Sequence, residues 1–508
     1  MITLRARLLA ALLAGLFALT FAAASFAEPA ARRPDSAKEQ ATEAHRLPAD
    51  VTTEQTLELP DRTLRFKATA GSIPINNGEG KLQAELAFIA YVRPDIEASA
   101  RPLTFVFNGG PGASSAYMQL GALGPWRLPL DNITPSSTPT VVPNPDTWLD
   151  FTDLVFVDPV GTGYSRFIAT GDEVRKQFWS VDGDIDVLAT FMRKWIEKNG
   201  RQASKKFIAG ESYGGFRSPK LASKLNDQGV GVSGLVMVSA VLDFGWRGNG
   251  RHSPLAWVSR LPSMAAAARE ANATFDREAL RDAERYAAGD YLQDLTRGEH
   301  DTAALERISA RVAQLTGLDP VLVRRLAGRV DTRTFIRERN RDRGLVASMY
   351  DATVLGLDPE PNSASSHYDD PVLSVIRAPL STAMTDLYAR VLNWRVEEPY
   401  QLLNNRVNSR WDWGGGRSTH EVVGELRSLL AADPHLRVLV THGATDLVTP
   451  YFETQLILNQ MPAFATPDRL KFSVYGGGHM YYSRDASRRA LREDAKELFR
   501  AVEQTPRG

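Results

Sequence analysis

The chain has 508 residues, enough for one large domain or two ordinary ones, and 43% of them are hydrophobic, which indicates a globular protein with a substantial core. Its 60 Lys and Arg residues balance its 60 Asp and Glu residues, so no basic excess points to nucleic acid. It has no cysteine, which excludes disulfides, a thiolate nucleophile and a cysteine metal site.

The first residues have the composition of an export signal. Arg5 and Arg7 precede an uncharged stretch rich in Leu, Ala and Phe, which ends at Ser25-Phe26-Ala27. We predict a signal peptide over residues 1–27, cleaved after Ala27, and a periplasmic or extracellular protein of a bacterium that does not contact the membrane after cleavage. An uncleaved anchor is the alternative, because the apolar stretch is about long enough to span a bilayer.

The region after this signal changes from polar to strand-like. Residues 28–50 are rich in Ala, Pro, Glu and Arg without apolar periodicity, which predicts a flexible lead-in. Residues 63–70 and 82–92 flank a polar turn at Asn76-Asn77-Gly78 and predict antiparallel strands at the edge of a sheet.

Continuously apolar runs follow, as in buried parallel strands. Between them lie helical patterns, for example from Ile185 to Ile196, where a helix should end at Asn199-Gly200. Strands that alternate with helices predict a doubly wound α/β domain. The predicted strands are 103–107, 154–157, 206–210, 234–241, 437–440 and 471–475.

One long segment interrupts this alternation. Residues 246–400 contain no convincing strand, and Asp319-Pro320 has the form of a helix start, a cap residue followed by proline. We predict a mostly helical insertion, or cap, that divides the core into residues 51–245 and 401–508. Its clearest amphipathic stretches are 276–288, 302–315 and 320–330.

A candidate nucleophile follows the strand at 206–210. Gly210-Glu211-Ser212-Tyr213-Gly214 is a G-x-S-x-G sequence, which places a serine on a sharp turn between a strand and a helix. The flanking glycines are needed because side chains would clash in so tight a turn. We therefore predict Ser212 as a nucleophile on an α/β-hydrolase fold, with a mixed, mostly parallel sheet.

A serine hydroxyl needs a base, and in this fold the order along the chain is serine, acid, histidine. His479, after the strand at 471–475, is the histidine that follows the candidate acids at strand ends. Asp446, just past the strand at 437–440, is the best placed acid, and it can orient the imidazole. The alternative role for Asp446 is to cap a helix over 451–459.

Residues 108–112 read N-G-G-P-G and follow the strand at 103–107. No lysine follows as a phosphate-binding loop requires, and the spacing does not fit a dinucleotide fingerprint. Acyl transfer needs an oxyanion hole made of the N–H after the nucleophile, here that of Tyr213, and an N–H from an earlier glycine loop. Asn108-Gly109-Gly110 stands in that place. Such a site uses no cofactor and no metal, and we predict none.

Four ordered motifs together resemble the serine carboxypeptidases of the carboxypeptidase Y type. They are N-G-G-P-G-A-S-S (108–115), V-D-P-V-G-T-G-Y-S (157–165), G-E-S-Y-G-G (210–215) and G-G-H-M (477–480). The resemblance covers residues 100–245 and 400–490 and implies Ser212, Asp446 and His479 as a catalytic triad.

The same resemblance implies further site residues. Gly110 and Tyr213 are implied as oxyanion donors, and Asn108, the Gly109 N–H and Glu211 as the groups that hold the C-terminal carboxylate of a peptide substrate. Glu211 can donate to a carboxylate only while it is protonated, which predicts better binding at acidic pH.

The sequence also departs from the pattern of that family. Many members carry a second Glu in the helix after the glycine loop, where this chain has Ala122, with Gln119 one turn earlier as a substitute. This difference leaves open an esterase, aminoacyl hydrolase or acyltransferase on the same triad. A binding scaffold without catalysis is the third hypothesis, and the intact triad argues against it.

Overall fold

The computed structural model describes residues 46–130, 133–247, 252–270, 275–414 and 420–504. The predicted signal peptide and the predicted lead-in up to residue 45 lie outside this part of the chain. Residues 46–50, at the end of that lead-in, are held by the folded body. Arg46 and the Leu47 N–H donate to Glu85, and the Trp394 indole donates to the carbonyls of Pro48 and Ala49.

A mixed sheet runs through the protein, and its parallel half matches the predicted strands. From β3 onward the order is β7, β4, β9, β10, β13 and β14, and the strands from β7 to β14 are parallel. The continuous apolar runs are therefore confirmed as strands. They are buried except in the edge strand β14, where residues 471–475 are only partly buried, and the run predicted over 234–241 ends as a strand at Val238. Their bounds are β7 Asp153–Val157, β4 Leu103–Phe107, β9 Lys206–Glu211, β10 Gly234–Val238, β13 Arg437–Gly443 and β14 Leu470–Tyr475.

The other end of the sheet is antiparallel, as the sequence predicted. β2 (Thr63–Asn76) pairs with β3 (Leu82–Val92), and β3 pairs antiparallel with β7 and with the short β8 (Arg166–Phe167). The edge strand β1 (Val51–Glu58) pairs with β2 and was not predicted, although every second residue of V-T-T-E-Q-T-L-E is partly or fully buried. Most residues of β1 are polar, so this alternation does not appear as a hydrophobic pattern in the sequence.

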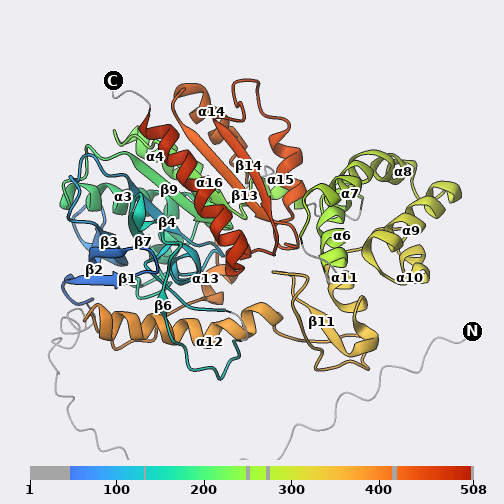
Figure 1. Ribbon diagram of the computed structural model, residues 1–508, viewed down its shortest axis with the longest axis horizontal. Helices are drawn as coiled ribbons and strands as arrows, with labels where there is room; N and C mark the ends of the chain where they lie inside the picture. Colours follow the sequence, from blue (N-terminus) through green and yellow to red (C-terminus); the bar gives the residue numbers. More distant parts are fainter. Residues whose placement is uncertain (1–45, 131–132, 248–251, 271–274, 415–419, 505–508) are drawn as a thin grey trace, which may run out of the picture. The chain divides into compact units, whose positions relative to one another are not determined.

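Helices cover both faces of the sheet because neighbouring strand residues point to opposite sides. Phe105 and Phe107 of β4 pack with α3 (Val181–Lys198), α4 (Tyr213–Asp227) and α14 (Val423–Ala432). Val106 packs in the other layer with α16 (Asp485–Glu503), which crosses the sheet in Figure 1. α3 ends at Lys198 with Asn199 as its cap, as predicted.

The segment between β10 and β13 is mostly helical but contains two short strands that were not predicted. β11 (Leu345–Ala347) and β12 (Leu355–Leu357) form a small antiparallel sheet. Asp319 caps α10 with its carboxylate, as its sequence context indicated. The helices are α5 Leu255–Val258, α6 Leu261–Glu270, α7 Arg281–Tyr286, α8 Leu292–Arg297, α9 Thr302–Thr316, α10 Pro320–Arg325, α11 Thr332–Glu338 and α12 Pro371–Asp386.

This segment divides between two cores. The helices from α6 to α11 lie to one side of the sheet (Figure 1) and pack around a hydrophobic cluster that includes Ile308 and Phe335 and extends to Tyr451 of α15 (Tyr451–Leu458). α12 instead packs Ile376 and Leu380 into the core layer that contains α16.

The remaining α-helices of the described residues lie outside residues 246–400. They are α1 Ala116–Met118, α2 Asp172–Phe178 and α13 Asn405–Ser409.

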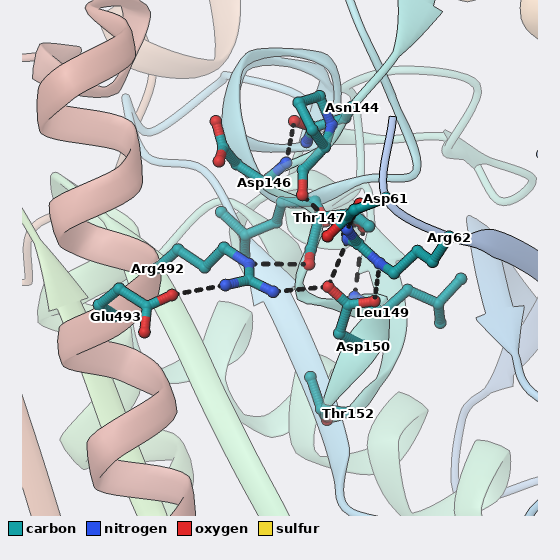
Figure 2. Close-up of polar contacts among 12 residues, drawn as sticks. Asp61, Arg62, Asn144, Asp146, Thr147, Leu149, Asp150, Thr152, Arg492 and Glu493 are labelled. Atoms are coloured by element: carbon teal, nitrogen blue, oxygen red, sulfur yellow. Dashed lines mark hydrogen bonds and ion pairs between the residues drawn. The ribbon is translucent and has the colours of Figure 1, made fainter. Parts of the chain in front are cut away.

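An ion-pair network joins the turn between β1 and β2 to the last helix, α16 (Figure 2). Asp150 accepts hydrogen bonds from Arg62, in the turn between β1 and β2, at 2.9 and 2.6 Å, and from Arg492 of α16 at 2.6 Å. Arg62 also reaches the Pro145 carbonyl. One carboxylate thus holds the N-terminal hairpin against the last helix. In the described residues, none of the helices is both long and apolar enough to span a bilayer.

Candidate active site

Ser212 lies at the junction of β9 and α4, in the sharp turn that its motif predicts. Its backbone has φ 59° and ψ −121°, a strained conformation for a residue other than glycine. A Cβ atom at Gly210 would lie 2.1 Å from the Gly214 carbonyl oxygen, and one at Gly214 would lie 2.5 Å from the Phe107 oxygen. The glycines of the motif are therefore required by this close approach, which leaves Ser212 partly exposed.

Asp446 and His479 are paired, as the order of residues predicted. His479 Nδ1 lies 2.7 Å from Asp446 Oδ2, and both side chains are buried. The loop after β13 supplies Asp446 and the loop after β14 supplies His479. Because these strands are parallel neighbours, their carboxyl ends bring the two side chains together.

Asp446 also stabilises its own loop. Its Oδ1 accepts hydrogen bonds from the backbone N–H groups of Val448 and Thr449 at 2.7 and 2.9 Å, and the Thr449 hydroxyl donates to Oδ2 at 2.6 Å. These contacts hold the turn that leads into α15, which begins at Tyr451. Asp446 does not cap α15 itself, because the N-cap residue of that helix is Pro450, without a side-chain hydrogen bond. It stabilises the turn before the helix while its Oδ2 also faces His479.

Ser212 and His479 are anchored on consecutive residues at the end of β10. The Val238 carbonyl accepts the Ser212 N–H at 2.8 Å, and the Ser239 hydroxyl donates to the His479 carbonyl at 2.7 Å. Ser239 itself has φ 46°. One strand end thus fixes the backbone of both the predicted nucleophile and the predicted base.

The N-G-G-P-G loop lies against the Ser212 turn. A Cβ atom at Gly109 would lie 2.6 Å from the Tyr213 nitrogen and 2.8 Å from Ser212 Cβ, so only glycine fits. Gly110 follows with φ 102° and is exposed. Tyr213 is the first residue of α4, where a backbone N–H has no partner within the helix. This arrangement can offer N–H donors beside the serine, as an oxyanion hole does.

Glu211 and Asn108 form a buried polar pair beside the nucleophile. Asn108 Nδ2 donates to Glu211 Oε2, and Asn108 Oδ1 accepts the Met118 N–H at 3.0 Å. Burial raises the pKa of Glu211 to about 7, although nearby His479 and the hydrogen bonds from Tyr482 and Asn108 oppose this increase. Glu211 can therefore carry a proton at mildly acidic pH.

The partner of Glu211 is not the residue that the sequence suggested. Gln119 does not substitute for the missing second Glu, because its amide donates to the Tyr91 hydroxyl at 2.8 Å. The Tyr482 hydroxyl donates instead to Glu211 Oε2 at 2.8 Å. Tyr482 was not predicted as a partner of Glu211, because no local pattern in the sequence indicates a contact between residues 271 positions apart.

Two further buried carboxylates fix the loops around the site. Asp184 pairs with Arg217, which also donates to the Asn108 carbonyl at 2.6 Å. Asp158, from the V-D-P-V-G-T-G-Y-S motif, accepts the Ser115 N–H at 2.8 Å and so ties β7 to the glycine loop. Burial raises the pKa of Asp158 to about 7.

A segment of the insertion, residues 348–353, crosses the loops that carry Asp446 and His479, and we call it the strap. The Tyr350 carbonyl accepts the His479 N–H at 2.5 Å, and the Tyr350 ring lies edge-on to the imidazole at 5.4 Å. Asp351 accepts the Thr445 hydroxyl at 2.8 Å and the Gly478 N–H at 3.1 Å. The insertion thus supports both loops of the pair.

Known proteins that are similar to this chain include serine carboxypeptidases. The model of the family described as serine carboxypeptidase matches residues 60–237. Over these residues the chain is therefore similar to the serine carboxypeptidase family. Serine carboxypeptidase-like 26 of Arabidopsis thaliana is 29% identical over 184 residues, which are 35% of this chain and 38% of the relative.

A second relative is pheromone-processing carboxypeptidase kex1 of Schizosaccharomyces pombe. It is 32% identical over 182 residues, which are 35% of this chain and 31% of the relative. The matched region spans about a third of the length of these two curated relatives. The crystal structure of the prohormone-processing carboxypeptidase Kex1(delta)p from Saccharomyces cerevisiae covers 85% of this chain and 91% of its own, with 16% identity and a TM-score of 0.53. The predicted α/β-hydrolase fold is thereby confirmed.

Within the described residues, no group of three His, Asp or Glu side chains is placed to hold a metal ion. The polar side chains at the carboxyl ends of β4, β9, β13 and β14 are those of an asparagine, a glutamate, a serine, an aspartate and a histidine. Their arrangement suits nucleophilic attack on a carbonyl carbon, with proton transfer through an imidazole.

Proposed function

We propose that this protein is a serine-type carboxypeptidase that removes C-terminal residues from peptides. The observation that carries the proposal is the buried Asp446–His479 pair beside the strained Ser212 turn, with Glu211 and Asn108 next to it. A triad alone serves many acyl transfers. The additional buried amide and protonatable carboxyl group favour a substrate with a free carboxylate.

In the proposed mechanism, Ser212 Oγ attacks the last peptide carbonyl while His479 accepts the hydroxyl proton. Asp446, hydrogen-bonded to Nδ1, keeps the imidazole in the tautomer with a free Nε2 and stabilises the imidazolium. The N–H groups of Gly110 and Tyr213 stabilise the oxyanion. His479 then protonates the leaving amine, and water releases the acyl group from Ser212 by the reverse transfers.

Asn108, the Gly109 N–H and Glu211 hold the carboxylate of the departing residue in this proposal. A Glu211 carboxylate would repel it, whereas a Glu211 carboxyl group donates a hydrogen bond to it. With a pKa of about 7, Glu211 is protonated below that pH and loses its proton above it. Binding of free C-termini is therefore best on the acidic side of pH 7.

A hydrolase or transferase of another specificity remains the second candidate, favoured by Ala122 in place of a carboxylate. Release of the last residue from N-blocked dipeptides, compared with the matching C-terminal amides, separates the two. We expect release from free acids in large excess over amides at pH 6, abolished in Ser212→Ala. Equal rates for acids and amides would favour the second candidate, and failure of Ser212 to react with a fluorophosphonate would favour a binding scaffold.

We also propose that the chain is exported, on the composition of residues 1–27. The measurement is the N-terminal sequence of the protein recovered from cells. Cleavage after Ala27 is the expected result, and an intact Met1 on protein recovered from membranes would support the anchor instead.

A further inference from the structure

Tyr482 is a fully buried side chain that lies between the histidine loop and the glycine-loop helix. It follows His479 by three residues, in the short turn Tyr481–Ser483. A Cβ atom at Gly121 would lie 2.7 Å from the edge of its ring, so the ring rests directly on the backbone of the residue that precedes Ala122. Tyr482 thus fills space beside the position where the family resemblance implies a second Glu.

The Tyr482 hydroxyl makes a specific contact there. It donates to Glu211 Oε2 at 2.8 Å, the same oxygen that accepts the Asn108 amide. Burial and the nearby Glu211 raise the pKa of Tyr482 well above its usual value, so this hydroxyl keeps its proton. Both groups can therefore donate to Oε2 over the whole physiological range of pH.

Two donors on one oxygen decide where Glu211 can carry its own proton. A proton on Oε2 would point toward the hydrogens that the Asn108 amide and the Tyr482 hydroxyl donate to the same oxygen. A proton on Oε1 avoids this repulsion. We propose that Tyr482 is a positioning residue that directs the Glu211 proton to Oε1, so that Glu211 donates a hydrogen bond to the substrate carboxylate. This inference rests on the proposed function and names the residue that replaces the second carboxylate.

The charge environment of Glu211 comes from several elements, and each must be considered in a pH experiment. His479 favours the ionised form and Asp446 opposes it. The tyrosines that interact with Glu211 are buried or largely buried and have raised pKa values, so they stay neutral as Glu211 titrates. They are Tyr117 of α1, Tyr350 of the strap, and Tyr481 and Tyr482.

Tyr482→Phe tests the proposal because it keeps the ring on Gly121 and removes only the hydroxyl. Loss of a donor to the carboxylate favours the protonated form, so the alkaline limb of kcat/KM for free-acid peptides should move upward by about one pH unit. With its proton no longer directed to Oε1, KM for free acids at pH 5 should rise about tenfold with kcat unchanged. Amide substrates should show neither effect.

Tyr481→Phe is the matched control. Tyr481 is the neighbouring residue, equally buried, and its hydroxyl lies 2.5 Å from the Thr441 hydroxyl rather than against Glu211. Tyr481→Phe should leave the alkaline limb of kcat/KM at the same pH as in the unmodified protein. A shift of equal size in both variants would mean a general loosening of the turn and would overturn the proposal.

A direct measurement separates this inference from the proposed function. In the Ser212→Ala background, the infrared carbonyl band of protonated Glu211, assigned by its loss in Glu211→Gln, can be titrated without substrate. The band should persist to higher pH in Tyr482→Phe. An unchanged titration would overturn the role of Tyr482 even if peptides are cleaved, and a shifted one would support it even if the enzyme shows no preference for free acids.

A second variant covers the case in which Tyr482→Phe does not fold. Replacement of Tyr482 by 3-fluorotyrosine keeps the ring and the hydroxyl but makes the hydroxyl a stronger donor. The infrared titration of Glu211 should then move to lower pH, opposite to the effect of Tyr482→Phe. Movement to higher pH, or none, would contradict the proposal.

Discussion

At the scale of single residues, the proposed chemistry depends on side chains held by more than one contact. Asp446 contacts His479 and the Thr449 hydroxyl with Oδ2 and two backbone N–H groups of its own loop with Oδ1, so orientation of the imidazole and stability of the turn are coupled. Ser212 has a strained backbone because glycines allow the surrounding segments to approach it closely. Changes at these positions should therefore affect rate and folding to different extents.

Asp446→Asn should lower kcat by about 10⁴-fold, because the amide can present an N–H to Nδ1 and stabilise the wrong tautomer of His479. KM should change little, since Asp446 does not face the bound carboxylate in the proposed mechanism. Steady-state kinetics on an N-blocked dipeptide measures both constants. A loss of less than tenfold in kcat would contradict the role of Asp446.

Gly109→Ala should reduce kcat/KM by at least about 10²-fold, because its Cβ would displace the Tyr213 N–H from the oxyanion site. Gly231→Ala is the matched control, because a Cβ atom there would meet no atom within 4 Å. The measurements are kcat/KM and the thermal unfolding temperature of both variants, which separate an effect on catalysis from an effect on folding. Equal activity of the two variants would show that the glycine loop does not contact the reacting groups.

The sequence predicted those residues whose type and position follow from local rules. G-x-S-x-G after an apolar strand identifies Ser212, and strand ends identify Asp446 and His479, because these rules need only short segments. Tyr482 and the strap could not be found in this way. Tyr482 meets Glu211 only when the chain closes on itself, and the strap reaches His479 from the insertion.

At the scale of elements, the strap joins the insertion to the loops of the proposed triad. Met349 and Ala352 bond to Leu447 and Thr445, and glycine at 478 lets Tyr350 approach the histidine loop. Strands β11 and β12, on either side of the strap, escaped prediction because each has only three residues. Short strands leave no periodicity to detect, whereas the longer α9 and α14 do.

Asp351→Ala should loosen both loops at once, because it removes the acceptor of the Thr445 hydroxyl and of the Gly478 N–H. We expect a loss of roughly tenfold in kcat, from misplacement of His479, and about 1–3 kcal/mol in the free energy of unfolding. Asp369→Ala, at an exposed position between the strap and α12, is the control. If both variants behave like the unmodified protein, the strap does not position the pair.

At the scale of the whole molecule, two buried carboxyl groups link stability to pH. Burial raises the pKa values of Asp158 and Glu211 to about 7 in the folded protein, from 3.8 and 4.5. At pH values between the unfolded-state and folded-state pKa values of these groups, the folded state binds more protons than the unfolded state. Their contribution to the free energy of unfolding is therefore complete at low pH and is lost as pH rises toward 7.

Asp158→Asn should flatten this dependence, because the amide is neutral at every pH. Between pH 4 and 7, the substitution should remove a decrease in the free energy of unfolding that approaches about 1.4 kcal/mol per pH unit, the limit for one proton. Urea unfolding at several pH values measures it, with Asp342→Asn, at an exposed site, as the control. An unaltered slope would mean that Asp158 titrates normally in the folded protein.

The most direct test of the account is the pH dependence of kcat/KM for a free-acid peptide in Glu211→Gln. We expect that the unmodified protein loses its preference for free acids over amides as pH rises through about 7, since Glu211 then loses its proton. Glutamine keeps a donor at all pH values, so the variant should retain its preference above pH 7. The same decline in both proteins would contradict the assignment of Glu211 as the group that holds the substrate carboxylate.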